Sequence, residues 1–189
     1  VATLANGFAM YCLFSVAHDG SHRAISKIPA VNEWLGRIAI MMLMPVAPLE
    51  ATRWLHMQHH RFTNGPDDPD QFIHHGSKWT LLLRWPNIDA FYLYFFITRG
   101  KEHLRRSLKA VLIYSVVFFS LIGVLIWAGY GWEVLTLWFI PSRIGLTLIS
   151  LVFVFLPHYP GNTAAADNVY RASTIRQGQV PSVRVGNGC

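Results

Sequence analysis

Residues 110–128 have the sequence AVLIYSVVFFSLIGVLIWA, which contains no charged side chain. About 20 apolar residues in a helix cross the hydrocarbon core of a bilayer, so this stretch predicts a membrane-spanning helix. The turn Gly129-Tyr130-Gly131 follows, and residues 134–157 form a second apolar stretch that is interrupted by Pro141 and Arg143. The two stretches predict a helical hairpin. A charge at mid-depth is costly, so Arg143 must face a polar interior or lie on a tilted span.

The composition also favours a membrane protein. Apolar residues make up 52% of the 189 residues and charged residues only 14%, whereas soluble domains are about one quarter charged. This composition excludes a disordered chain, and two cysteines are too few for a disulfide framework or a cysteine zinc cluster. The net charge of +6 is spread too thinly for nucleic-acid binding and fits a membrane surface instead. The length allows one domain.

Three other segments complete the expected architecture. Residues 1–17 are apolar and indicate the end of a third span. Residues 33–48 are apolar but too short to cross the membrane twice, so we expect them to be interfacial or re-entrant. The same applies to residues 79–98, where polar residues break the apolar pattern. The fold class is therefore an all-α integral membrane protein with transmembrane helices, interfacial helices and a cytoplasmic-side histidine cluster.

Orientation follows from the basic residues beside the spans. Residues 99–109 (RGKEHLRRSLK) directly precede the first clear span. Lys and Arg near the ends of spans favour the cytoplasmic side. The hairpin then leaves the cytoplasm and returns, which also places His158 on the cytoplasmic side.

Histidines fall into two short windows, His18-Asp-Gly-Ser-His22 and His56-Met-Gln-His59-His60. Residues three or four apart share one face of a helix, so each window can aim its imidazoles at one point. Imidazole suits iron, zinc, copper and nickel, and two such windows at the ends of apolar segments predict a metal site. For His158, which follows Phe-Leu-Pro, a ligand role and a structural role stay open.

The remaining candidates surround these windows. Asp67, Asp68 and Asp70 follow the second window in the run Asn64-Gly-Pro-Asp-Asp-Pro-Asp. A metal-bound histidine usually donates its other N–H to a carboxylate or carbonyl. The candidates for such support are Asp19, Asn64, Asp67 and Asp70; the run is equally consistent with an ordinary turn set by its prolines. We expect three further histidines to be solvated surface residues: His74, His75 and His103.

The pair HDGSH and HMQHH resembles the first and second histidine boxes of the membrane fatty acid desaturase superfamily, which includes carotenoid hydroxylases and ketolases. The similarity continues through RFTNGPDDPD to FLPHYP and NVYRASTIR, and so covers residues 11–176. We expect residues 1–176 to form a desaturase-like domain that is incomplete at both ends. Residues 177–189 are expected to be a non-homologous or disordered polar tail.

The resemblance implies a cytoplasmic-facing site with two iron ions that activates O2 and attacks an unactivated C–H bond of a lipid chain. It implies the metal ligands His18, His22, His56, His59 and His60, with His158 as an additional ligand. It also implies a ferredoxin, rubredoxin or cytochrome b5-like electron donor and a location in the bacterial inner membrane. Desaturation of a fatty acyl chain is favoured, because the second box with its aspartate-rich run looks desaturase-like.

One feature departs from the family pattern. The superfamily has a third box of the form His-x-x-His-His, and no such box follows His158 in this sequence. We therefore expect a truncated or frame-shifted chain that is inactive unless another chain supplies ligands.

Alternatives remain at this point. A carotenoid hydroxylase or ketolase would use the same boxes. His18-Asp19-x-x-His22 also mimics the His-Glu-x-x-His helix of an intramembrane zinc protease, although that assignment leaves the second window without a role. A bis-histidine haem protein needs single histidines within facing spans. A non-catalytic metal-binding remnant follows if the truncation is natural.

Overall fold

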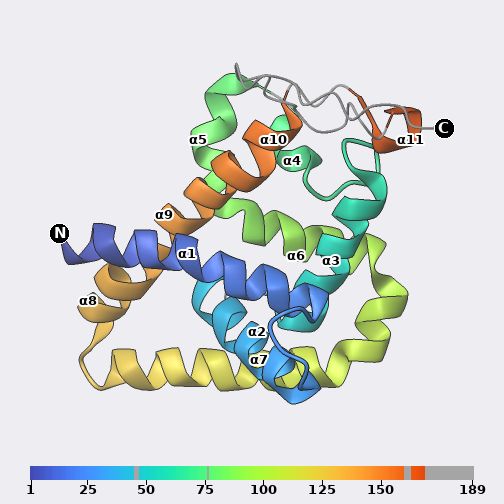
Figure 1. Cartoon of the computed structure of the whole chain (residues 1–189). Helices are drawn as coiled ribbons and strands as arrows, with labels where there is room; N and C mark the ends of the chain where they lie inside the picture. The colour runs from blue at the N-terminus through green and yellow to red at the C-terminus, as the bar shows by residue number, and fades with distance from the viewer. Residues whose placement is uncertain (45–46, 76, 160–162, 169–189) are drawn as a thin grey trace.

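The chain is described here from a computed structural model, which covers residues 1–44, 47–75, 77–159 and 163–168 (Figure 1). In chain order the elements are α1 (Ala2–His22), α2 (Pro29–Leu43), α3 (Leu49–Phe62), α4 (Gln71–His74), η1 (Lys78–Thr80), α5 (Leu81–Arg84), η2 (Trp85–Asn87), α6 (Ile88–Arg99), α7 (Lys101–Trp127), α8 (Gly131–Glu133), η3 (Val134–Phe139), α9 (Ile140–Ile149), η4 (Ser150–Phe155), α10 (Leu156–His158) and α11 (Ala165–Asn168). No strand occurs in the described ranges. The predicted tail, residues 177–189, lies outside them.

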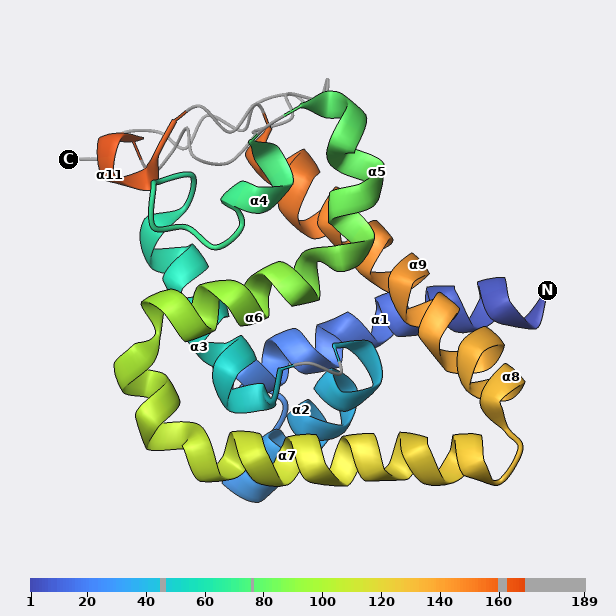
Figure 2. The ribbon, with the colours of Figure 1, turned by 180° about the vertical axis from the view of Figure 1, so that it is seen from behind.

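The predicted hairpin is confirmed. Helix α7 has 27 residues, and the elements α8 to α10 join into one continuous helix of 28 residues, Gly131–His158; both are long and apolar enough to cross a membrane. The two helices diverge from the turn at Gly129, and α1 and α2 lie between them in both views (Figures 1 and 2). Helix α7 buries only Phe118 and exposes apolar side chains on its other faces. The chain is an all-α membrane protein.

The second long helix passes two prolines without breaking. The π-helical stretch η3 ends two residues before Pro141, and the π-helical stretch η4 ends two residues before Pro157. Proline removes a backbone donor and its ring clashes with the preceding turn. A π turn is wider than an α turn, and each such stretch gives the ring room to remain in the helix. The second of these stretches carries the helix on to His158.

Helices α1, α2 and α9 pack closely because glycines line their crossings. A Cβ atom at Gly20 of α1 would lie 2.8 Å from the Cα of Gly36 in α2, and one at Gly145 of α9 would lie 2.8 Å from the Cβ of Met10 in α1. These contacts hold the end of α1 that carries the first histidine window. The expectation that residues 33–48 are interfacial or re-entrant stays a prediction; most of the segment forms α2.

Arg143 faces a polar interior, as the sequence suggested. Its two terminal nitrogens donate to both carboxylate oxygens of Asp89, at 2.9 and 2.7 Å. It also donates to the carbonyl of Pro86 at 2.9 Å. Asp89 is fully buried at the start of α6. The pair joins the second long helix to the broken segment 79–98, which the structure divides into η1, α5, η2 and α6.

Candidate metal site

Three histidines from two helices converge on one point. His22 lies in the last turn of α1, and His56 and His60 lie one turn apart on α3. The Nε2 atoms of His22 and His56 are 2.8 Å apart, those of His56 and His60 are 3.0 Å apart, and those of His22 and His60 are 3.2 Å apart. The helical spacing of the windows thus brings the imidazoles of these three residues to one point, as the sequence predicted.

These three short contacts cannot all be hydrogen bonds. A neutral imidazole Nε2 either carries a proton or accepts one, so at least one edge of the triangle sets two donors or two acceptors against each other. A shared metal ion removes this conflict. Two nitrogens bound at right angles to one metal, each about 2.1 Å from it, lie about 3.0 Å apart. The triangle therefore fits three ligands of one first-row transition metal, and imidazole is a suitable donor for iron.

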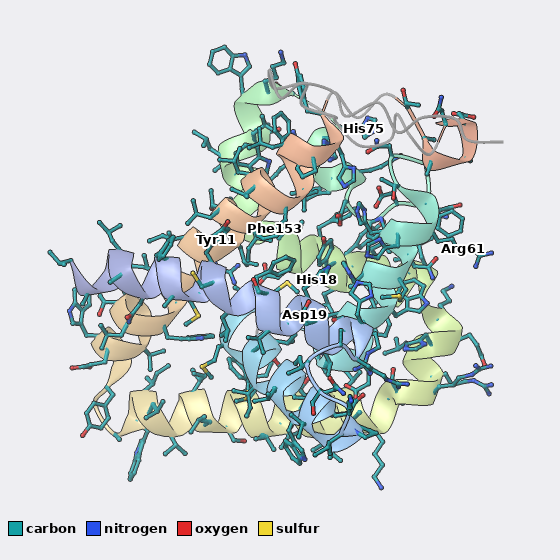
Figure 3. All side chains as sticks on the ribbon, viewed as in Figure 1. Tyr11, His18, Asp19, Arg61, His75 and Phe153 are labelled. Atoms are coloured by element: carbon teal, nitrogen blue, oxygen red, sulfur yellow. The ribbon has the colours of Figure 1, made fainter. Side chains whose placement is uncertain are left out.

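His18 completes a four-histidine cluster with His22, His56 and His60. One ring nitrogen from each of the four lies within 4.8 Å of the others. The ring of His18 is 4.7 Å from those of His22 and His56. Its Nδ1 lies 3.1 Å from Oδ1 of the adjacent Asp19, the kind of contact that fixes the orientation of a ligating ring. Figure 3 shows both residues on the length of α1 that passes α3.

His59 lies outside the four-histidine cluster, with its ring 5.7 Å from that of His60, and is held by two aspartates. Its Nδ1 lies 3.0 Å from Oδ1 of Asp68 and 3.1 Å from Oδ2 of Asp70. Asp68 also accepts from the backbone N–H groups of Asn64 at 2.7 Å and Asp70 at 2.9 Å. Because N–H donors surround both oxygens of Asp68, this carboxylate acts as a hydrogen-bond acceptor that orients His59, and the Nε2 of His59 is left for a ligand.

The two other predicted supporting residues, Asn64 and Asp67, lie in different environments. Asn64 adopts a left-handed conformation (φ 60°), and its side chain donates to the carbonyl of Thr163 at 3.1 Å. Its contact with Asp68 links it to His59 through one intermediate. Asp67 instead is exposed and pairs with Arg99 at 3.1 Å, so the structure does not bring it to the histidines. Asp68 contacts His59 instead, and no local pattern in the sequence distinguishes it from Asp67.

His158 lies beside His59, with ring centroids 4.9 Å apart. The expectation that His74 is a surface residue is wrong. Its ring stacks on Phe155 at 5.7 Å and meets His158 at 6.1 Å, and both its ring nitrogens are buried. The neighbouring His75 is exposed, as expected (Figure 3).

The surface prediction for His103 is also wrong, because its ring is partly buried. It stacks on Trp54 at 6.1 Å and packs edge-on against Phe96 at 6.0 Å. Trp54 lies on the face of α3 that packs against α6 and α7, so the basic sequence around His103 did not predict this contact.

Arg53 fixes α1 against α3. It donates to the terminal carbonyls of α1, at 2.9 Å to Gly20 and 3.1 Å to Ser21, and to Oε1 of Glu33 at 2.9 Å. The last carbonyls of a helix lack intrahelical partners and favour a cation. Arg53 precedes His56 by three residues and shares its face of α3, so these bonds set the position of His22 relative to His56.

Burial and neighbouring charges determine the protonation of the histidines. Burial, with the nearby imidazoles, lowers the pKa of His56 to about 2 and also lowers the pKa of His60. Burial lowers the pKa of His74 to about 4. Burial opposes the charge on His59 as well, but Asp70 and Asp68 outweigh it and raise its pKa to about 9. His56 and His60 are therefore neutral at pH 7, as metal ligation requires.

A cavity of about 190 Å³ adjoins the histidines. Its wall is formed by histidines and mainly apolar side chains, among them Phe14, Ile40, Leu43, Leu146 and Phe153. Phe153 contacts Phe14 at 4.9 Å and Tyr11 at 5.9 Å, where α1 crosses the last long helix (Figure 3). The histidines thus adjoin a largely apolar cavity.

Comparison with known proteins agrees with this arrangement. The family model for fatty acid desaturases matches residues 1–187. An sn-1 oleoyl-lipid 12-desaturase from Picosynechococcus sp. is 25% identical over 178 residues, covering 82% of this chain and 50% of the relative. One from Anabaena variabilis is 25% identical over 192 residues, covering 89% of this chain and 53% of the relative. The chain thus spans about half the length of these relatives. No solved structure matches it.

Proposed function

The chain belongs to the fatty acid desaturase family, and on this premise we propose that it takes part in the O2-dependent, iron-dependent desaturation of a fatty acyl chain in a membrane lipid. The observation that carries the proposal is that three members of the four-histidine cluster, His18, His56 and His60, line a largely apolar cavity. A metal centre beside an apolar cavity is what oxidation of an unactivated hydrocarbon requires. The zinc-protease alternative is disfavoured, because His56 and His60 share the cluster with His18 and His22.

The proposal assigns one iron ion to His18, His22, His56 and His60 and a second to the side of α3 that carries His59, with His158 as its partner. When bound, the two ions supply the activation of O2 and the oxidising power that no side chain has. The carboxylate of Asp19 lies 3.1 Å from Nδ1 of His18 and accepts its proton in a hydrogen bond, and the carboxylate of Asp70 attracts Nδ1 of His59 across 3.1 Å; these contacts hold both rings in place. Asn64 supports His59 through Asp68.

The apolar wall determines which bond is presented to the metal site. Phe14 and Phe153 stand in contact on one side of the cavity, and Ile40, Leu43 and Leu146 are buried on other sides. These side chains bind the acyl chain by burying its methylene groups and exclude water from the reacting carbon. The relatives are named for action on oleoyl lipids, and we propose an acyl lipid of this kind as the substrate.

The orientation of the site in the membrane and its electron donor belong to the proposed function. The site faces the cytoplasm of a bacterial inner membrane, because the basic residues 99–109 include the first turns of α7 and basic residues at the end of a span favour that side. There a soluble one-electron donor of the ferredoxin or rubredoxin type, or a cytochrome b5-like protein, supplies the electrons for O2 reduction.

The test is a fatty acid profile. The protein is produced with ferredoxin and its reductase in a bacterial host that makes only saturated and monounsaturated chains, and the methyl esters are analysed by gas chromatography and mass spectrometry. Because no third histidine box follows His158, the wild type is produced together with a chain that carries such a box. We expect an additional double bond with this pair and none when His56→Ala replaces the wild type at equal abundance in the membrane. Identical profiles would contradict the proposal. Hydroxylation of supplied β-carotene, with unchanged fatty acids, would indicate the carotenoid oxygenase alternative.

A further inference from the structure

His74 lies outside both histidine windows of the sequence and outside the four-histidine cluster. It ends α4, a short helix that follows the aspartate-rich turn. Both its ring nitrogens are buried, and neither has a hydrogen-bond partner among the described residues. An unpaired buried polar group costs free energy, and such a group in a native structure indicates a missing partner. Stacking on Phe155 accounts for the plane of the ring but satisfies neither nitrogen.

The surroundings of His74 identify what this partner is. Its ring meets that of His158 at 6.1 Å, and the ring of His158 meets that of His59 at 4.9 Å. Two imidazoles that share one metal, with metal–nitrogen distances of about 2.1 Å, have ring centroids about 4.5–6.5 Å apart, depending on the angle between the bonds. Both measured separations lie in this range. His59 is already oriented by Asp68 and Asp70 through its Nδ1, so its Nε2 can complete such a site.

We propose that His74 is a ligand of the second metal ion, together with His59 and His158. This inference rests on the proposed function, because it concerns the second of the two metal ions assigned there. Three imidazoles from α3, α4 and α10 give this ion a donor set that suits iron and the other first-row metals. The short helix α4 then has a role, because it places His74 beside His158 at the end of the second long helix.

The chain offers a matched control in the adjacent residue. His75 is exposed, whereas His74 is turned towards His158. The variant His74→Phe keeps a ring for stacking on Phe155 and removes the nitrogens, and His75→Phe makes the same chemical change outside the site. The 189-residue chain in detergent is stripped with a chelator and titrated with Co2+, and bound metal is counted after equilibrium dialysis.

We expect two Co2+ ions per chain for the wild type and for His75→Phe. For His74→Phe we expect the dissociation constant of the second ion to rise by at least about 10-fold, because even partners outside the ligand set are worth about 10–100-fold in metal affinity. Equal binding of two ions by His74→Phe and the wild type overturns the proposal, as does a wild type that binds fewer than two.

Thermal unfolding separates ligand loss from misfolding. The metal-free His74→Phe variant should unfold at a temperature near that of the metal-free wild type, whereas its gain in melting temperature on adding Co2+ should be smaller. If the metal-free variant does not fold, the same titration is made with His74→Gln, which retains a polar side chain, and undiminished binding of two ions by that variant overturns the proposal. These readouts count metal and do not depend on desaturation, so failure of the proposed function and failure of this site are distinguishable.

Discussion

Asp67 and Asp68 are adjacent in the chain but differ completely in environment. Asp68 is buried and accepts from His59 and two backbone N–H groups, whereas Asp67 is exposed and pairs with Arg99. We expect Asp68→Asn to weaken metal binding at the His59 side by about 10–100-fold, the range for partners that orient a ligating histidine. Asp67→Asn should leave the affinity unchanged. Equal Co2+ affinities for the two variants in dialysis would contradict the orienting role of Asp68.

The stability of the metal-free chain depends on pH through the shifted pKa values of His56 and His59. Folding holds His56 neutral, with a pKa of about 2, whereas its ordinary value is 6.5. The unfolded chain therefore takes up more protons below that value, and stability falls as the pH falls. Between pH 7 and pH 5, His56 alone should lower the free energy of unfolding by about 2 kcal/mol.

His59 acts in the opposite direction in this experiment. Its pKa is raised to about 9, so its stabilising contribution is fully present below 6.5 and is lost as the pH rises through about 9. Thermal unfolding in chelator at pH 5, 7 and 9 measures both effects. The highest melting temperature is expected near neutral pH, and the loss on the acid side should shrink in His56→Ala. A melting temperature that increases towards pH 5 would contradict the neutral state of His56.

At the scale of elements, Arg53 connects the helices that carry the two histidine windows. Its bonds to the last carbonyls of α1 hold His22 in reach of His56. Arg53→Gln should lower Co2+ affinity of the four-histidine cluster by at least about 10-fold, since one hydrogen bond to a charged group contributes about 1.5–3 kcal/mol. Arg61→Gln is the control, because Arg61 lies on the same helix and is exposed (Figure 3). Unchanged affinity in Arg53→Gln would show that glycine packing alone sets the helix positions.

The long helices and the shared face of His56 and His60 could be predicted from the sequence, whereas the contacts of the turn after α3 could not. Helical spacing placed His56 and His60 on one face, and the apolar runs located both long helices. The contacts of Asp68 and His74 could not be predicted in this way, because they depend on how the turn after α3 folds back. The left-handed residue in that turn, Asn64, is the local signal of a reversal. It does not specify which aspartate faces inward, since that depends on tertiary contacts.

For the whole molecule, the buried pair of Asp89 and Arg143 ties the second long helix to α6. Removing one partner leaves an uncompensated buried charge, which costs about 3–5 kcal/mol. Asp89→Leu should therefore destabilise the protein strongly, whereas the double variant Asp89→Leu with Arg143→Met should recover most of the loss. Chemical unfolding of the wild type and the two variants in detergent measures this. A double variant no more stable than Asp89→Leu would mean that the apolar replacements do not pack.

This pair also bears on how the protein is made. Arg143 lies 54 residues after Asp89, so the acid has already been synthesised when the helix with the guanidinium reaches the translocon. An arginine at the centre of a nascent helix opposes insertion by about 2.5–3.5 kcal/mol. A carboxylate that is already in place can pair with the guanidinium, and this pairing lowers the cost of insertion. Membrane insertion of the second long helix then depends on α6, which carries Asp89. A glycosylation-tag insertion assay should show a smaller inserted fraction for Asp89→Leu, with full recovery when Arg143 is also replaced. The order of synthesis thus becomes part of what places His158 at the metal site.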